Sequence, residues 1–575
     1  MDKNLFQIVK NYGYKSLSII FLLLFISSIL ELLVIGSIIP FAAVMVDVNN
    51  IENIKIINLI YKKLNFQNHE NFIIFLGVVF FLINLILNFY GILSKYIIEK
   101  RVWKQYRHVS LQYFFNLFDK NVLELEKKNL SEQYSKILSE LAAVFNVQVN
   151  AYFEIISKII SIIIITSLLI FINYKITILA LAFSMIIFFI FYFILKNKIN
   201  NLGKIQVNIN RSRINSIIQI FNSIREIKLY KNTNFFFNYD LIFKKFMKNA
   251  ISLSILQKAP RFFLEPLFLL LILSIIFLMN IYDDLLNFLP ILGVFIYSTL
   301  RILPAINSII ASSNSINSFK FSLNEIYPDI KNISFKDEFI TNKKVKENYE
   351  VDKKINEIKF ENVQFEFPNQ QFKCNFNFSI HHNKKYTVIG ANGSGKSTLI
   401  NIFLGIIRPQ SGSILINQTP YKHLDFSAWQ EQISFVPQRI YLMEASLREN
   451  ITFNFGDNYT DEKLLEKALY ISCIDLANFP IDLDTKIHEN GKNLSGGQIQ
   501  KIAIARAVYR SSNIMVLDEA LSSIDYETKK IIQNRIDNNN QTVIQVSHDV
   551  QALNNDRIIK VNNGKIVFEG PFKDS

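Results

Sequence analysis

Six apolar stretches in the first half of this chain constrain its fold more than any other feature. A helix needs roughly 20 mostly apolar residues to cross about 30 Å of hydrocarbon. We therefore predict six membrane-spanning helices, at Leu17–Phe41, Phe72–Leu93, Phe153–Ile172, Ile176–Leu195, Phe262–Met279 and Leu289–Leu303. An even number of spans places both ends of this region on the same side of the membrane.

The distribution of basic residues predicts which side that is. Lys and Arg are concentrated between Lys95 and Lys120 and between Lys196 and Lys258, whereas the turns on the opposite face carry few charges. Cytoplasmic loops hold an excess of Lys and Arg, so both termini are predicted to be cytoplasmic. Both basic segments have helical patterns, which suggests that membrane helices continue into the cytosol. These loops also account for the net charge of +14, so we expect no nucleic-acid partner.

Four charged residues within or beside the predicted spans are candidate substrate contacts, because charge is costly in hydrocarbon. Arg261 and Glu265 are one helical turn apart and are expected to pair. For Arg261 and Arg301, an interfacial position with the side chain reaching the headgroups is the alternative interpretation. The four candidates are Glu31, Arg261, Glu265 and Arg301.

Segment 50–65 has apolar residues at helical spacing among lysines. This pattern is typical of an amphipathic helix on the outer membrane surface, and equally of a helix packed on its own protein. After Tyr327 the chain becomes polar. We predict a transmembrane domain with long cytoplasmic extensions at residues 1–327, a linker at 328–354 and a second domain at 355–575, which opens with strand-like apolar runs.

A phosphate-binding motif lies near the start of the second domain. Residues 390–397 fit the pattern G-x-x-x-x-G-K-[ST], after a strand pattern at 386–389 and before a helix pattern. The glycines let backbone N–H groups wrap phosphates, Lys396 reaches the β- and γ-phosphates, and the Ser397 hydroxyl binds Mg²⁺. The predicted ATP-binding residues of this loop are Gly390, Ala391, Asn392, Gly393, Ser394, Gly395, Lys396, Ser397 and Thr398.

A second strand pattern, at 514–517, ends in two carboxylates, Asp518 and Glu519. A carboxylate at the tip of a buried strand beside the phosphate loop suits Mg²⁺ coordination. Its neighbour Glu519 could then polarise an attacking water. Together with the phosphate loop, this pair predicts a nucleotide hydrolase that uses ATP and Mg²⁺.

The segment between these two elements resembles the signature of ATP-binding cassette (ABC) transporters. Six spans followed by one cassette resemble an ABC exporter half-transporter along the whole chain. The resemblance implies a fold in which an α-helical six-span membrane domain is fused to a C-terminal α/β P-loop nucleotide-binding domain. The signature residues are Leu494, Ser495, Gly496, Gly497 and Gln498.

The same resemblance implies roles for residues outside the phosphate loop and signature. Gln438 matches the Q-loop, which senses Mg²⁺ and the γ-phosphate, and Asp525 lies in the D-loop. His548 matches the switch histidine, which acts in catalysis together with Glu519 and Gln438. Phe367 stands where an aromatic residue stacks on adenine. The implied Mg²⁺ ligands are Ser397, Gln438 and Asp518.

In ABC exporters the signature of one cassette closes over the phosphate loop of another. The resemblance therefore implies a homodimer in which Leu494–Gln498 completes the partner's ATP site in trans. It also implies that segments Glu126–Tyr134 and Ile224–Asn234 act as coupling helices. The six spans exclude a soluble ABC ATPase of repair or translation.

Scattered features of the membrane half resemble PglK-type flippases of lipid-linked oligosaccharides. These are Glu31 with Pro40, the turn at 172–177, Arg261 with Glu265, and Arg301 with Pro304. The resemblance implies that a sugar-pyrophosphate-polyprenyl lipid moves from the cytoplasmic to the periplasmic leaflet of a bacterial inner membrane. Arginine suits the pyrophosphate through charge-assisted hydrogen bonds. A general lipid or hydrophobic-drug exporter and a peptide exporter remain alternatives, because cassette motifs do not specify cargo.

Overall fold

The computed structural model describes residues 3–46, 48, 50–66, 68–118, 130–172, 174–281, 285–331, 355–366, 372–420, 426–455, 460–488, 491–547 and 557–571. The chain divides into two compact units, one built from the helices up to residue 331 and the other from the residues after 354. The predicted linker at 328–354 lies largely outside the described residues, although the last helix of the first unit continues to Ile330.

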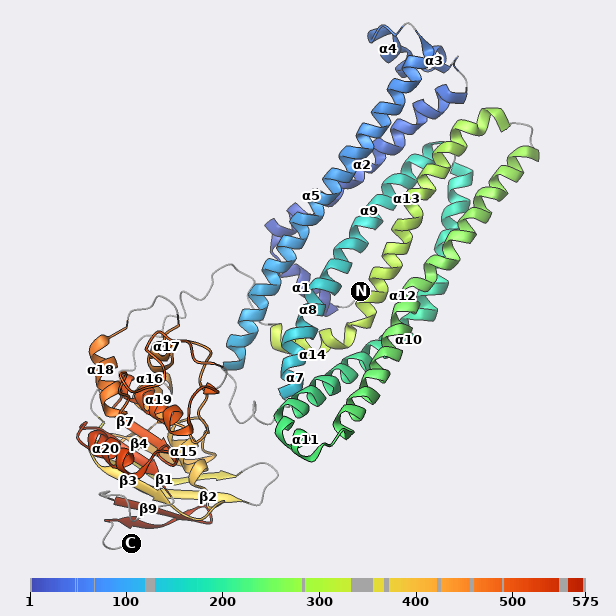
Figure 1. Ribbon diagram of the computed structural model, residues 1–575. Coiled ribbons are helices and arrows are strands. Elements are labelled where there is room, and N and C mark those ends of the chain that lie inside the picture. Colours follow the sequence, from blue (N-terminus) through green and yellow to red (C-terminus); the bar gives the residue numbers. More distant parts are fainter. Residues whose placement is uncertain are drawn as a thin grey trace. The chain divides into compact units, whose positions relative to one another are not determined.

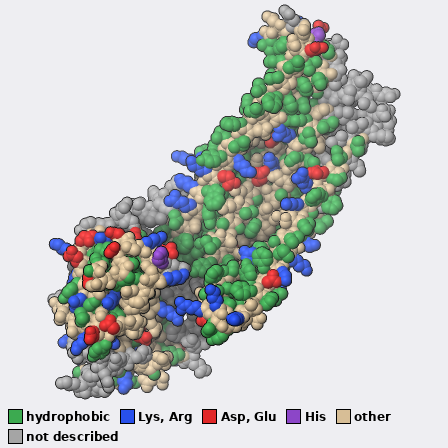
Figure 2. Space-filling view, viewed as in Figure 1, with side chains coloured by type: hydrophobic (Ala, Val, Ile, Leu, Met, Phe, Trp, Pro, Cys, Tyr) green, Lys and Arg blue, Asp and Glu red, His purple; other side chains and the backbone are tan. Residues whose placement is uncertain are grey.

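Six long helices form the body of the first unit, and each contains one predicted span (Figure 1). They are α2 (Tyr14–Val46), α5 (His69–Phe118), α9 (Asn150–Ile172), α10 (Tyr174–Asn222), α12 (Asn234–Ile281) and α13 (Leu285–Ser318). Among the described residues, α2, α5, α13 and the helical segment that ends with α9 are apolar and long enough to cross a membrane. Hydrophobic side chains cover much of the visible face of this unit (Figure 2).

Three of these helices are much longer than a bilayer requires. Helices α5, α10 and α12 contain 50, 49 and 48 residues, which at 1.5 Å per residue is about 72–75 Å each. At this length each helix is more than twice as long as the roughly 30 Å of a hydrocarbon layer, so the predicted span takes up only part of it. Shorter helices complete the unit: α1 (Lys3–Lys10), α3 (Asn50–Asn53), α4 (Lys55–Lys63), α7 (Leu130–Ser135), α8 (Leu141–Ala143), α11 (Ile224–Tyr230) and α14 (Lys320–Ile330).

Segment 50–65 folds as the short helices α3 and α4. Ile51 and Ile57 are buried against Phe72 of α5, so one face packs on the protein itself. Leu59 on the other face is 69% exposed, and Leu64 is 51% exposed. The structure therefore shows one apolar face packed on the protein itself, whereas contact of the exposed apolar side chains with a lipid surface stays a prediction.

The helix preceding α9 is wound unusually. Two π-helical turns, η1 (Lys136–Glu140) and η2 (Val144–Val149), flank α8. π-helical turns are rare in proteins, and those that do occur often lie at functional sites. Helices α1, α5, α14 and this π-helical region share one apolar core, which contains Val109, Phe145 and Leu323.

Gly203 of α10 lies against the backbone at the end of α13. A Cβ atom at this position would lie 1.9 Å from the carbonyl oxygen of Ser318. In an ordinary helix interior, Gly→Ala is stabilising by up to about 1 kcal/mol. Here overpacking against backbone is expected to reverse the sign, so that Gly203→Ala lowers the free energy of unfolding by about 1–3 kcal/mol.

Thermal unfolding of the purified protein in detergent measures this effect. Gly91→Ala in α5 is the matched control, because a Cβ at Gly91 would meet nothing within 4 Å. An unchanged or raised melting temperature for Gly203→Ala would show that α10 and the end of α13 can move apart without lowering the free energy of unfolding.

The second unit is built on a ten-stranded sheet with the order β5-β4-β1-β2-β10-β9-β3-β8-β7-β6. Strands β3 (Lys385–Ile389), β8 (Thr542–Val546), β7 (Ile514–Asp518) and β6 (Ile433–Val436) are parallel neighbours. Strands β7 and β8 are buried along almost their whole length, as expected for the central strands of a sheet that is covered on both faces. The other strands are β1 (Glu357–Glu366), β2 (Lys373–His381), β4 (Ser411–Ile416), β5 (Thr419–Pro420), β9 (Arg557–Asn562) and β10 (Lys565–Gly570).

Within the described residues, helices α15 to α20 accompany this sheet and complete an α/β unit, as the sequence predicted (Figure 1). Helix α15 follows β3, and α20 lies between β7 and β8 in the chain. Ligands of parallel α/β sheets bind outside the carboxyl ends of the strands. The helices are α15 (Lys396–Phe403), α16 (Phe426–Glu431), α17 (Leu447–Thr452), α18 (Glu462–Ile471), α19 (Gly496–Tyr509) and α20 (Tyr526–Asp537).

Candidate nucleotide-binding site

The phosphate loop connects β3 directly to α15. Gly393 and Gly395 have φ angles of 78° and 108°, a region in which side chains other than glycine are strained. The loop therefore turns sharply, and α15 begins directly at its end, so that the N-terminus of the helix lies at the loop. Backbone N–H groups at such a helix start attract phosphate.

Lys396, the first residue of α15, lies inside this loop. The side chain is buried, and its Nζ donates hydrogen bonds to the carbonyl oxygens of Gly390 (2.7 Å) and Ala391 (3.0 Å). The loop thus holds the ammonium group in place for an incoming phosphate. The next residue, Ser397, is exposed, whereas Thr398 is buried.

Three predicted catalytic or metal-binding residues meet at the carboxyl ends of β7 and β6. Asp518 is the last residue of β7, Glu519 follows it, and Gln438 lies two residues beyond β6. The Gln438 side chain donates a hydrogen bond from Nε2 to Oε2 of Glu519, at 2.7 Å. Glu519 has a φ angle of 50°, an uncommon conformation for a non-glycine residue that is concentrated at functional sites.

The electrostatics of this edge favour a cation. Burial raises the pKa of the Asp518 carboxyl, the neighbouring Glu519 raises it further, and Lys396 lowers it. A second positive charge would therefore relieve the repulsion between the two carboxylates. The carboxylate of Asp518, the hydroxyl of Ser397 and the amide oxygen of Gln438 are oxygen ligands of the kind that Mg²⁺ prefers.

The signature segment forms the start of α19. Ser495 caps this helix and forms a reciprocal capping box with Gln498, in which the Ser495 N–H donates to Gln498 Oε1 at 2.7 Å. Leu494 packs on the core of the surrounding helices. A Cβ at Gly497 would lie 3.0 Å from the Ser523 carbonyl oxygen, whereas Gly496 faces the Ser523 side chain more loosely.

Gln500, which the sequence analysis missed, joins the signature helix to the D-loop. Its Nε2 donates to Ser522 Oγ (3.1 Å), and its Oε1 accepts from the Ser523 N–H (2.8 Å). Asp525 then caps α20 by accepting from the Thr528 N–H at 2.9 Å. The signature and the D-loop therefore form one connected structure. Gln500 lies 22 positions before Ser522 in the chain, and no sequence motif connects the two residues.

Arg506 of α19 is a second residue that the sequence did not single out. Its guanidinium lies over the Phe453 ring, 4.6 Å from the centroid, and its Nε donates to the Asn450 carbonyl at 2.9 Å. Burial lowers the pKa of Arg506 to about 10. Arg506 thereby links α19 to α17.

Two predicted site residues, His548 and Phe367, lie outside the described residues.

The membrane candidates fall into three separate arrangements. Glu31 of α2 accepts a hydrogen bond from the Ser161 hydroxyl of α9. Arg261 and Glu265 of α12 pair with each other at 2.6 Å, as predicted from their spacing. Arg301 of α13 donates from Nη2 to Asn84 Oδ1 (2.8 Å) and to the Tyr297 hydroxyl (3.1 Å).

Comparison with known proteins agrees with this geometry. The profile of the ABC transporter family matches residues 374–522, a range that contains the phosphate loop, Gln438, the signature and the Asp518–Glu519 pair. A solved structure of a bacterial Atm1-family ABC exporter with ATP bound superposes with a TM-score of 0.80, covering 98% of this chain and 96% of that chain at 16% identity. The chain carries an ABC transporter domain and has the fold of an ABC exporter.

Two similar proteins are named ATP-dependent lipid A-core flippases. The flippase 2 of Colwellia psychrerythraea is 35% identical over 230 residues, which is 39% of this chain and 39% of that protein. The flippase of Neisseria meningitidis serogroup B is 34% identical over 220 residues, covering 37% of this chain and 35% of that protein. The chain thus spans less than two fifths of the length of these relatives. The ABC domain and the exporter fold support the half-transporter resemblance that the motifs indicated.

Proposed function

We propose that this protein hydrolyses ATP to move a lipid across a membrane. The observation that carries this proposal is the Glu519 carboxylate, held by Gln438 at the end of β7 beside the phosphate loop. Glu519 would orient the attacking water and accept its proton, and Lys396 would bind the β- and γ-phosphates. Mg²⁺, when held by Ser397, Asp518 and Gln438, would neutralise phosphate charge.

The remaining ATP-site residues fit the same proposal. We assign His548 to the γ-phosphate side and Phe367 to the adenine, as the family resemblance implies. The signature would act in trans, which requires a homodimer with two ATP sites. Helix α11, which lies within the predicted coupling segment 224–234, would transmit the motion in each protomer.

We further propose that the cargo is a lipid-linked oligosaccharide and that it is flipped from the cytoplasmic to the periplasmic leaflet of a bacterial inner membrane. The half-buried Arg301 supports this assignment. Both of its hydrogen bonds within the described residues use Nη2, so the Nε and Nη1 groups remain as further donors. Each of these N–H groups can donate a charge-assisted hydrogen bond to a pyrophosphate oxygen. The names of the relatives support a lipid cargo but not this particular head group.

Flipping of labelled lipids in proteoliposomes tests the proposal. Purified protein is reconstituted with a fluorescent lipid-linked oligosaccharide, with lipid A-core or with a neutral phospholipid, and each is assayed with ATP. We expect ATP-dependent movement of the lipid-linked oligosaccharide. Movement of lipid A-core alone would show that the cargo is lipid A-core and not a lipid-linked oligosaccharide. ATP hydrolysis without movement of any lipid would contradict a flippase function.

Arg301 is expected to matter for transport and not for basal ATP hydrolysis. Arg301→Met should lower flipping of the lipid-linked oligosaccharide by about 10-fold or more, since a charge-assisted hydrogen bond contributes roughly 1.5–3 kcal/mol. Basal hydrolysis should stay near wild type. Lys95→Met, which removes an exposed cation of α5, is the matched control. Equal flipping by both variants would exclude Arg301 as a cargo contact.

A further inference from the structure

Three side chains from two long helices form a closed triangle of hydrogen bonds around Arg301. Tyr297 and Arg301 lie one turn apart on α13, and Asn84 comes from α5. Arg301 Nη2 donates to Asn84 Oδ1 at 2.8 Å and to the Tyr297 hydroxyl oxygen at 3.1 Å. Asn84 Nδ2 donates to the same hydroxyl oxygen at 3.0 Å. Each of these half-buried side chains therefore contacts both of the others.

The chemistry of arginine fixes the direction of every hydrogen bond in this triangle. A guanidinium only donates, so the Asn84 atom that faces Arg301 must be the amide oxygen. The amide nitrogen of Asn84 then faces Tyr297, and it also only donates. The hydroxyl oxygen of Tyr297 therefore accepts from both partners. Because a phenol oxygen has two acceptor sites and one O–H, the proton of this hydroxyl must point toward an acceptor outside the triangle.

The Tyr297 hydroxyl is held in place while its proton stays available. Phe80 of α5 meets the Tyr297 ring edge-on, with the ring centroids 5.5 Å apart and the planes at 72°. Among the residues that the structure describes, none accepts a hydrogen bond from this hydroxyl. The proton is thus one more donor close to the Arg301 guanidinium, in addition to the Nε and Nη1 groups. Toward a ligand, Tyr297 and Arg301 present donors only.

The charge of Arg301 lies in a region that is predicted to cross the membrane. Asn84 is 12 positions from one end of the predicted span 72–93 and nine from the other, and Arg301 is 12 positions after the start of the predicted span 289–303. A charge at such a depth is costly unless it is paired. Within the described part of the chain, Arg301 forms no ion pair, and its hydrogen-bond partners are neutral. An anion that reached the triangle would supply the counter-charge.

A negatively charged group that only accepts hydrogen bonds fits these donors. The oxygens of an ionised phosphodiester or pyrophosphate accept hydrogen bonds and donate none. Hydrogen bonds from O–H or N–H groups to such oxygens are short and strong. A sugar hydroxyl both donates and accepts, and it would bring no charge to Arg301. The triangle therefore has the chemistry of a phosphoryl site and not of a sugar site.

We propose that Tyr297 is a second donor to the pyrophosphate of the cargo, and that Asn84 positions it by occupying one acceptor site of its hydroxyl oxygen. This inference rests on the proposed function and adds a specificity-determining residue to it. Arg301 supplies the positive charge, whereas the Tyr297 hydroxyl supplies a hydrogen bond that only an acceptor can use. Together they distinguish a pyrophosphate-linked sugar from a neutral glycolipid.

Equilibrium binding to the full-length protein in lipid nanodiscs, without nucleotide, tests the role of Tyr297. The two labelled probes are a lipid-linked oligosaccharide and a neutral polyprenyl glycoside that carries the same sugars without phosphate. Tyr297→Phe removes the hydroxyl and keeps the ring that Phe80 contacts. Tyr90→Phe is the matched control, because the hydroxyl of Tyr90 in α5 already donates to the Leu23 carbonyl at 3.1 Å.

Tyr297→Phe is expected to lower the affinity for the lipid-linked oligosaccharide by about 10-fold or more, the usual effect of losing a hydrogen bond to a charged group. Its affinity for the neutral glycoside should stay unchanged, which also shows that the variant is folded. Tyr90→Phe should bind both probes as the wild type does. Asn84→Leu should weaken binding of the oligosaccharide lipid more in the wild-type background than in the Tyr297→Phe background, because Asn84 acts in part through the hydroxyl.

Four results would count against the inference itself. Wild-type affinity of Tyr297→Phe for the lipid-linked oligosaccharide, together with a loss in Arg301→Met, would exclude Tyr297 as a donor and leave the cargo assignment intact. Equal loss for both probes would show that Tyr297 supports the packing of the helices and not the pyrophosphate. Equal losses for Asn84→Leu in both backgrounds would exclude Asn84 as a positioning residue. Displacement of the labelled lipid by an equal concentration of inorganic pyrophosphate would assign the triangle to a free anion.

A different result would remove the proposed cargo. If the wild-type protein binds no lipid-linked oligosaccharide, or binds it no more tightly than the neutral glycoside, the cargo assignment fails, and the role of Tyr297 fails with it. The comparison between wild type and Tyr297→Phe therefore separates the two proposals.

Discussion

Replacement of Glu519 by Gln is expected to lower ATP hydrolysis by about 100-fold or more while leaving ATP binding intact. A positioned general base typically contributes 10²–10⁴-fold, and an amide cannot accept the proton of the attacking water. The glutamine keeps the shape of the side chain and can still hydrogen-bond with Gln438. ATP should therefore remain bound, and the protein should accumulate in an ATP-bound closed state.

Phosphate release and binding of labelled ATP measure the two effects separately. Glu527→Gln is the matched control, because Glu527 is an exposed acidic residue of α20 in the same unit. Near wild-type turnover in Glu519→Gln would show that another group is the base. Loss of nucleotide binding in this variant would instead indicate that Glu519 has a structural role in the phosphate loop.

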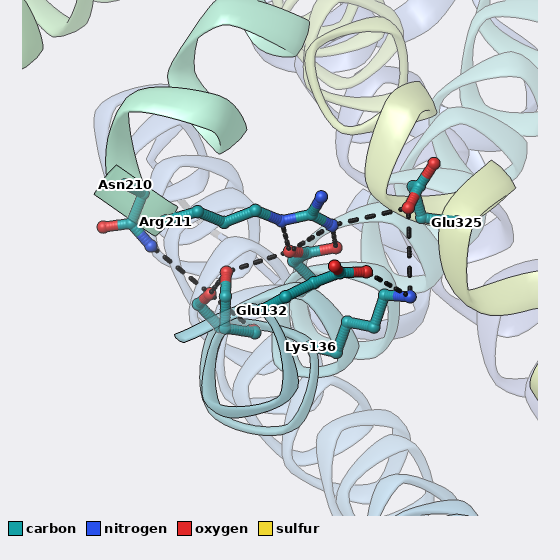
Figure 3. A network of polar contacts seen from close by, with 8 residues as sticks. Glu132, Lys136, Asn210, Arg211 and Glu325 are labelled. Atoms are coloured by element: carbon teal, nitrogen blue, oxygen red, sulfur yellow. Dashed lines mark hydrogen bonds and ion pairs between the residues drawn. The ribbon is translucent and has the colours of Figure 1, made fainter. Parts of the chain in front are cut away.

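Replacement of Glu140 by Ala is expected to destabilise the membrane unit by about 3–5 kcal/mol, because it removes one partner of a buried ion pair. The side chains of Glu140 and Arg211 are 3% and 18% exposed. Within the part of the chain that the structure describes, the Arg211 guanidinium would then keep one ion pair, with the more distant Glu325 at 3.5 Å (Figure 3). The double variant Glu140→Leu with Arg211→Leu should recover most of the loss, since an apolar pair leaves no unpaired charge.

Thermal unfolding in detergent, followed by loss of monodisperse protein, measures this effect. Asp240→Ala provides the control, because Asp240 pairs with Lys244 at 2.6 Å but both side chains are more than half exposed. Exposed pairs contribute at most about 1 kcal/mol. A melting temperature for Glu140→Ala that matches the control would show that water reaches the Glu140–Arg211 pair.

Much of the fold could be predicted from local patterns. Each of the six predicted spans lies within one long helix. The thickness of a bilayer sets the length of apolar run that a spanning helix needs, and that length can be read directly from the sequence. The phosphate loop was equally predictable, since the positive φ angles of Gly393 and Gly395 require glycine at fixed positions between a strand and a helix. Asp518 and Glu519 were found because they end an apolar strand.

The contacts between distant segments were not predictable in this way. Gln438 and Glu519 are 81 positions apart and meet only because β6 and β7 are neighbours in the sheet. Gln500 joins Ser522, and Arg211 reaches Glu140 across 71 positions, with no periodic pattern to mark either pair.

By itself, then, the sequence determined the spanning helices, the phosphate loop and the family resemblance, because each depends on residues close together in the chain. Only the tertiary structure decided that a π-helical turn places Ser135 and Glu140 on one face, that Arg211 neutralises the buried carboxylate, and that the Ser322 hydroxyl is buried without a hydrogen-bond partner among the described residues. The physical reason is that burial, ion pairing and cavity shape depend on which helices pack together, and packing brings together residues that no local pattern connects.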